Sequence, residues 1–198
     1  MRSRAGVRFL ATVTLLVVAR GLDACSTWIA TRDLSLETNP LTRLLHVGWG
    51  GLLLVNAAVI AFIAMCAWRA EREPAPLPAE CGLDVEEFVG RYWFAMRTRR
   101  SLRQAMFWLP ADRRVRRTFI GSAGATLIVA GSIAAATWNI LVARGIVTGR
   151  VIGLAGFAGF WIGLALALGV SVRLFLLRAF ARYERATMND AAAQATVL

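Results

Sequence analysis

Four apolar stretches of about 20 residues each constrain this chain more than any other feature of its sequence. They run over residues 9–30, 49–68, 119–142 and 151–177. A helix needs about 20 residues to cross the ~30 Å hydrocarbon core of a bilayer, so each stretch is long enough to span it. The sequence therefore predicts an all-α integral membrane protein, a four-helix bundle that forms one membrane domain over residues 1–198.

Arginine supplies every basic residue, and its distribution predicts how the spans are oriented. The chain has a net charge of +11 and contains no lysine. Arginines are dense before residue 9, between residues 69 and 117, and after residue 177, whereas the other two connections hold few. By the positive-inside rule, we expect a multi-pass protein of a bacterial inner membrane with both termini and the central connection in the cytoplasm. Residues 178–198 are expected to form a cytoplasmic tail.

The same composition excludes several classes of function. Without lysine the chain cannot form a retinal or pyridoxal Schiff base, a Walker-type phosphate loop or a biotin carrier. A single histidine, His46, rules out a two-histidine haem site or a multi-histidine zinc site within one chain. We predict no cofactor and no metal. Because the arginines flank the spans and form no separate basic domain, we expect anionic lipid head groups as their partner, and no nucleic acid.

The connection between the second and third spans, residues 69–117, divides into two parts. Three prolines within residues 74–78 mark a linker, because proline lacks an amide donor and restricts its neighbours. Asp84 and Glu87 then have the spacing of a capping box, and apolar residues recur on one helical face as far as Met96. This pattern predicts an additional cytoplasmic amphipathic interfacial helix. Docking of a partner protein on its apolar face, or packing under the membrane bundle, are the alternatives.

Small residues at four-residue spacing predict close helix packing in the third and fourth spans. They are Ser122, Thr126, Ala130 and Ala134 in the third span and Gly159, Gly163, Ala167 and Ser171 in the fourth. In lipid, such rows let helix backbones approach closely. The short connection over residues 144–150 makes these two spans an antiparallel pair, and the rows face either each other or another subunit.

Polar residues inside the first two spans are the best functional lead. Arg20 lies about halfway along the first span, where an ionisable group is costly and is usually paired or faces a bundle interior. Asp23 follows three residues later, so the two side chains can pair on one helix face. Ser26 and Thr27 extend that face, and Asn56 of the second span is placed to meet it across the bundle.

A second polar group follows the first span. Asn39 before Pro40 has the pattern of a helix start, because asparagine caps free amides and proline suits the first helical position. Glu37 lies just before it, where the helix dipole favours an anion. His46 is expected near the outer interface of the membrane.

The strings LDACST at residues 22–27 and ETNPL at residues 37–41 carry a resemblance to a known family. With them the chain resembles a family of small prokaryotic multi-pass membrane proteins grouped as a domain of unknown function. The resemblance covers about the first third of the chain and implies an integral membrane fold with this polar hairpin, and no particular activity. Members often carry a basic residue in the second span, where this chain has only Asn56.

Three functions compete on these residues. The first is a non-catalytic accessory or assembly subunit of a larger membrane complex, in which Arg20 and Asp23 form a structural pair. The second is an oligomeric transporter or proton-coupled carrier, in which Asp23, Glu37 and Asn56 line an outward-facing pocket. The third is an intramembrane enzyme that uses Asp23, Glu37 and His46, although no nucleophile-elbow or paired-histidine spacing supports it. We favour the accessory subunit, partnered by other membrane proteins or by further copies of this chain, because the sequence holds no complete catalytic set.

Overall fold

The structure is a computed structural model, which describes residues 2–32, 34, 48–146 and 154–195. Every regular element in these residues is helical. The elements are α1 (Arg2–Ala30), α3 (Trp49–Arg72), α4 (Val85–Tyr92), α5 (Leu102–Ala105), α6 (Arg113–Phe119), the π-helical segment η1 (Ile120–Gly124), α7 (Ala125–Ala143) and α9 (Leu154–Ala195). Four stretches are long and apolar enough to cross a membrane: Phe9–Ala30, Trp49–Arg72, Arg113–Ala143 and Trp161–Asn189. The all-α fold with four candidate spans is thus confirmed.

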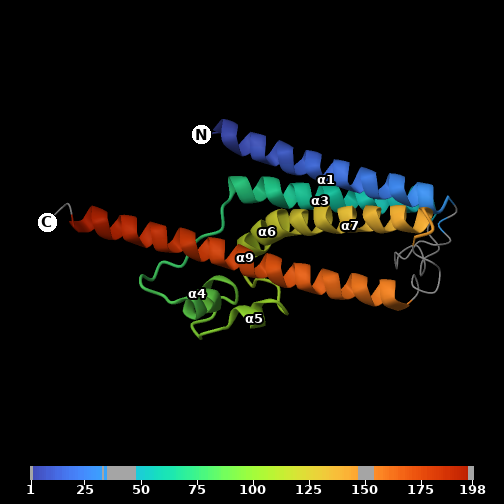
Figure 1. The fold of residues 1–198 in the computed structure, drawn as a ribbon. Helices are drawn as coiled ribbons and strands as arrows, with labels where there is room; N and C mark the ends of the chain where they lie inside the picture. The colour runs from blue at the N-terminus through green and yellow to red at the C-terminus, as the bar shows by residue number, and fades with distance from the viewer. Residues whose placement is uncertain (1, 33, 35–47, 147–153, 196–198) are drawn as a thin grey trace.

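Three of the long helices form the bundle proper. α1, α3 and α7 run side by side, and both chain termini lie at the same end of the molecule, called here the terminal end (Figure 1). Leu16 of α1, Ile63 of α3 and Ala125 of α7 are buried where these helices meet. α9 approaches this group mainly near η1, and its two ends extend away from it (Figure 1).

The third candidate span is one continuous helix that begins earlier than expected. α6 starts at Arg113, six residues before the predicted boundary, because Asp112 accepts hydrogen bonds from the amides of Arg114 (2.7 Å) and Val115 (3.0 Å). The helix widens to a π turn over η1, and it crosses α3 at Gly121. A Cβ on Gly121 would lie 2.6 Å from the Cα of Ala67, so this close crossing requires glycine.

The expected tail after residue 177 is not a tail. α9 continues without a break to Ala195. No glycine or proline follows Gly169, so nothing in the local sequence ends the helix. Its second half instead buries Ala179 and Tyr183 against the segment that follows α3.

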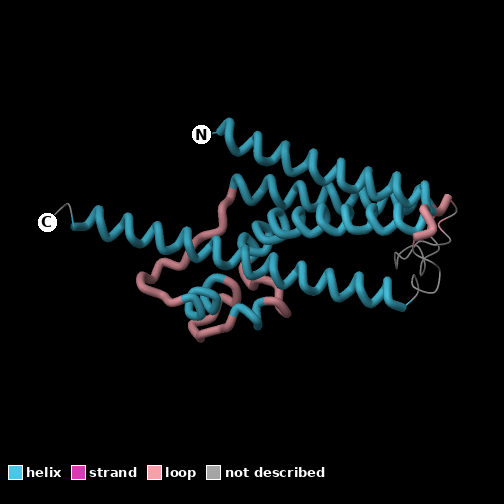
Figure 2. The backbone as a smooth tube through the Cα atoms, viewed as in Figure 1, coloured by secondary structure: helices cyan, strands magenta, loops and turns pink. Residues whose placement is uncertain are grey.

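That segment, residues 73–112, folds into a small unit that we call the cap. The proline linker leads from α3 into it as an extended loop (Figure 2). The predicted capping box forms: Asp84 accepts from the amide of Glu87 (3.0 Å), and the Glu87 carboxylate accepts from the amide of Asp84 (3.2 Å). The linker and this helix start are therefore where the sequence placed them.

The long amphipathic helix expected here is not confirmed, because α4 ends after eight residues. Ala95 takes a left-handed backbone conformation (φ 54°), and the amide of Met96 donates to the carbonyl of Gly90 at 2.9 Å. The chain then turns back over α4, with the Thr98 carbonyl against Gly90, where a side chain would collide. A second capping box begins the short α5 at Ser101.

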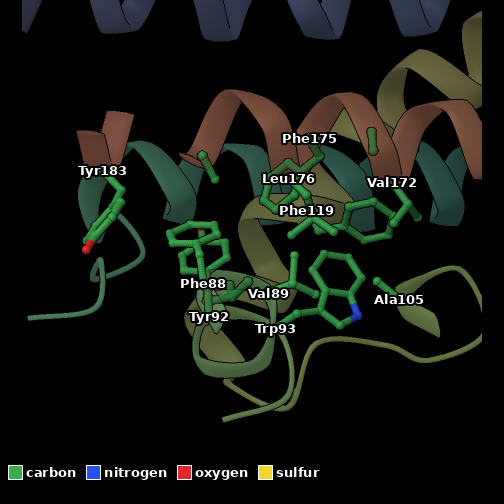
Figure 3. Close-up of a cluster of buried hydrophobic side chains, with 13 residues drawn as sticks. Phe88, Val89, Tyr92, Trp93, Ala105, Phe119, Val172, Phe175, Leu176 and Tyr183 are labelled. Carbon is green, nitrogen blue, oxygen red and sulfur yellow. The ribbon is translucent and has the colours of Figure 1, made fainter. Parts of the chain in front are cut away.

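The apolar face of α4 is buried against α9. Phe88 and Trp93 are fully buried. The Trp93 ring centroid lies 5.1 Å from that of Phe119 and 6.0 Å from that of Phe175 (Figure 3). Tyr183 of α9 accepts from the amide of Leu83 (3.0 Å) and donates to the carbonyl of Glu80 (2.6 Å). Packing under the bundle is therefore the arrangement that the structure has.

The rows of small residues in the third and fourth spans do not pack against each other. Ser122, Thr126, Ala130 and Ala134 are exposed, as are Gly159 and Gly163, while Ala167 and Ser171 are half-buried. α7 turns a different face, with Ala125 and Ser132, toward α1. In lipid, hydrophobicity does not distinguish the faces of an apolar helix, so polar contacts with a neighbour can decide which one is buried.

Candidate functional site

Arg20 is the centre of a polar cluster inside the bundle. Its Nη1 donates to the Asp23 carboxylate at 2.8 Å and to the Ser132 hydroxyl at 3.3 Å, and its Nη2 donates to the side-chain carbonyl of Asn56. The Arg20 side chain is 21% exposed and that of Asp23 is 16% exposed. One guanidinium group thus joins α1, α3 and α7 about halfway along the first span.

A second set of hydrogen bonds lies further along α1, away from the terminal end. The side-chain amide of Asn139 in α7 donates to the hydroxyls of Ser26 (3.1 Å) and Thr27 (2.9 Å). The Ser26 hydroxyl donates in turn to the backbone carbonyl of Asp23 (2.8 Å). Ser26 and Thr27 are each 5% exposed, so this set is shielded from the surface of the protein.

The two sets form one feature, which we call the polar seam. Its members are Arg20, Asp23, Ser26, Thr27, Asn56, Ser132 and Asn139. Five of these residues were proposed from the sequence, and the structure brings all five to the contacts among α1, α3 and α7. The remaining proposed residues, Glu37, Asn39 and His46, lie outside the described residues.

Ser132 and Asn139 are the two members that sequence reasoning missed. They are polar residues of the third span that lie seven apart, which places them two helical turns apart on one face. That spacing was a usable signal. The small residues from which we predicted packing of the third span have a different phase and lie on another face of the helix.

The hydrogen bonds of the seam join helices of this chain to one another. The Arg20 cation is paired with an adjacent carboxylate, and its Nη groups reach acceptors on all three helices, while its buried Nε has no partner among the described residues. A shallow open depression of about 360 Å³ lies between the cap and the start of α6, and none of the residues that line it belongs to the seam. Within the described ranges no three His, Cys, Asp or Glu side chains gather to hold a metal ion.

Fold and site together define a class: a helical protein with four apolar, membrane-length helices and a polar seam between three of them. Comparisons with protein-family models, with curated proteins and with solved structures find no match to this chain. The resemblance to a domain of unknown function therefore stays a prediction.

Proposed function

We propose that this chain is a non-catalytic accessory or assembly subunit of a larger membrane complex. The observation that carries the proposal is the exposure of residues 161–168 in α9. From Trp161 to Leu168 every residue is exposed except Ala167, which is half-buried. An apolar helical stretch that is exposed in this way offers most of its circumference to another helix.

The composition of this stretch suits helix association. Gly159, Gly163 and Ala167 recur every four residues, and a Cβ built on either glycine meets nothing within 4 Å. Small residues at this spacing let a partner helix approach closely and gain packing contacts that lipid does not supply. The polar seam supports the same proposal, because its charges are used to join helices of this chain.

Affinity purification in mild detergent from the native membrane tests the proposal. We expect a stoichiometric membrane partner with the wild-type chain, lost in Gly163→Leu because the larger side chain blocks the approach. The matched control is Gly21→Leu, which enlarges an exposed glycine of α1 that also has nothing within 4 Å of a built Cβ. A wild-type chain that purifies alone, or a partner lost equally from both variants, would contradict the proposal.

The carrier and enzyme alternatives depend on carboxylate chemistry, which Asp23→Asn and Glu37→Gln remove. An accessory subunit should keep its partner in both variants, because the amide oxygen that Asp23→Asn leaves in place still accepts a hydrogen bond from Arg20 and preserves the seam. Loss of the cellular function with the complex intact would favour a site-based function. The readouts are co-purification and growth complementation, measured in the same strains.

We also propose a bacterial inner-membrane location with both termini in the cytoplasm. The support is the arginine density at the terminal end and in the cap, where Arg99 and Arg103 are exposed. Cys81 of the cap is exposed and gives a direct test. In a variant whose only cysteine is Cys81, a membrane-impermeant maleimide should react only after the cells are opened; labelling of intact cells would reverse the orientation.

A further inference from the structure

The turn between α5 and α6 carries three large apolar side chains that are exposed in the described part of the chain. Phe107, Trp108 and Leu109 are 81%, 68% and 62% exposed, whereas the neighbouring Pro110 is buried. Three consecutive exposed side chains of this kind are unfavourable on a surface that faces only water. Their place in the fold indicates what covers them.

Met106 sets the depth of this turn along α9. Its sulfur lies 3.4 Å from the point where a Cβ on Gly169 would be. Gly169 belongs to the apolar stretch Trp161–Asn189 of α9. Arg173, which is exposed, follows four residues later toward the terminal end. At 1.5 Å per residue, the turn meets α9 about 6 Å on the apolar side of this arginine. With Arg173 taken as the level of the lipid phosphates, that depth is the boundary between head groups and acyl chains.

The backbone of the turn is suited to a poorly hydrated setting. The amide of Phe107 donates to the carbonyl of Gln104 (3.2 Å), and the carbonyl of Trp108 accepts from Nε1 of Trp93 (2.9 Å). Irregular backbone is tolerated near hydrocarbon only when its polar groups find partners within the protein. These bonds also fix the turn to the buried side of the cap through Trp93.

Charge on both sides of the turn fits a phosphate-bearing surface. Arg103 precedes the apolar residues, Arg113 and Arg114 follow them, and all three are exposed. Arginine near an anionic membrane surface is attracted to lipid phosphates at about the level where aromatic side chains insert. In α9, Leu166 and Val170 on either side of Gly169 are also exposed apolar residues.

We propose that the turn Phe107–Leu109 is a membrane wedge. It inserts at the boundary of head groups and acyl chains in the leaflet at the terminal end, and Arg103, Arg113 and Arg114 bind anionic lipid phosphates around it. The wedge holds the cap against the bilayer beside α9. This inference is independent of the accessory function proposed above, because it concerns lipid and a different surface.

Site-directed fluorescence in reconstituted vesicles tests the wedge. The purified chain is placed in vesicles of phosphatidylcholine and phosphatidylglycerol, with Cys25 and Cys66 replaced. One protein has Phe107→Cys with Cys81 also replaced, and the control keeps Cys81 alone; each cysteine carries an environment-sensitive probe. Compared with the probe on Cys81, we expect the probe at position 107 to emit at shorter wavelength, to be quenched severalfold more strongly by lipids spin-labelled near the head group, and to be protected from iodide. The probe on Cys81 should be quenched by iodide and little affected by the spin-labelled lipids.

Three outcomes would overturn the wedge. Iodide quenching at position 107 equal to that at Cys81 would place the turn in water. Protection from iodide and from spin-labelled lipid together would mean that a protein covers it. Quenching by lipid that does not weaken in vesicles of phosphatidylcholine alone would remove the role of the arginines. Because Phe107→Cys deletes one of the inserted rings, Leu109→Cys serves as a second labelled variant and should give the same pattern.

Discussion

In the polar seam, side chains of α1, α3 and α7 meet through hydrogen bonds and one ion pair. In the cap, by contrast, α4 and the adjoining Trp93 meet α9 through stacked and edge-on aromatic rings. The difference follows the surroundings of each region. Inside a bilayer, an apolar side chain gains little by leaving lipid for a neighbouring helix, so hydrogen bonds and close packing must hold the helices together. The cap lies outside the four candidate spans, and in water the burial of apolar surface is itself strongly stabilising.

The largest effect that would test this comparison is expected in the cap, from Trp93→Ala. Trp93 is fully buried between Phe119 and Phe175, and truncating such a side chain costs about 3–5 kcal/mol. In detergent, we expect trypsin to cleave the variant at the cap arginines faster than it cleaves the wild type. The cleavage rate is measured at increasing urea concentrations. The control Trp108→Ala removes an exposed indole and should change the unfolding free energy by no more than about 0.5 kcal/mol in detergent. Equal effects of the two variants would contradict burial as the source of cap stability.

The second largest effect is expected in the seam, from Arg20→Met. The variant leaves the Asp23 carboxylate without its cation, and since both side chains are partly exposed we expect a loss of about 2–3 kcal/mol, below the cost for a fully buried pair. Unfolding in increasing mole fractions of dodecyl sulfate measures it. Combining Arg20→Met with Asp23→Leu should recover part of the loss, because no unpaired charge remains. A double variant less stable than either single variant would show that the loss of stability in Arg20→Met does not come from an unpaired Asp23 carboxylate.

A third, intermediate effect is expected at the crossing of η1 and α3, which lies in the sequence between the cap and the part of α7 that contributes to the seam. Gly121→Ala places a Cβ against the backbone of Ala67 and should cost about 1–3 kcal/mol, because the crossing of α3 and η1 must widen. Gly131→Ala is the matched control, since a Cβ there meets nothing within 4 Å and alanine favours the helix. The same dodecyl sulfate assay should show Gly131→Ala equal to or more stable than wild type. The interpretation fails if the two variants are alike.

The smallest effect is a dependence on alkaline pH that is confined to the cap. Burial raises the pKa of Tyr92 above its ordinary value of 10.0; the nearby Arg182 partly offsets this, and Asp112 adds slightly to it. Since the unfolded chain then loses this proton at lower pH than the folded chain, the contribution to stability is present below about pH 10 and declines above it. Tryptic cleavage of the cap should therefore accelerate above that pH.

Two controls define the Tyr92 prediction. Tyr92→Phe should lose this part of the pH dependence. The difference in ultraviolet absorbance between wild type and Tyr92→Phe should titrate with a midpoint above 10.0. A midpoint at or below that value would contradict the burial of the phenol.

Much of the fold was accessible from the sequence because its signals are local. Hydropathy placed the four spans, and the spacing of Asp84 and Glu87 placed the start of α4. The pairing of Arg20 with Asp23 also required only the geometry of one helix. Five of the seven seam residues, those of α1 and Asn56, were thus predicted from the sequence, while Ser132 and Asn139 were found only in the structure.

The sequence by itself determined where helices form and which charged group lies at mid-span, because length, hydropathy and helical periodicity act within a few turns of chain. Only the tertiary structure decided that α4 stops at Tyr92, that α9 continues to Ala195, and that α7 turns Asn139 toward α1. Each of these depends on a partner far away in the sequence. In a membrane the local sequence says least about which face of a helix is buried, because lipid accepts any apolar face. Only a hydrogen bond or a close backbone contact with a residue far away in the sequence selects one face.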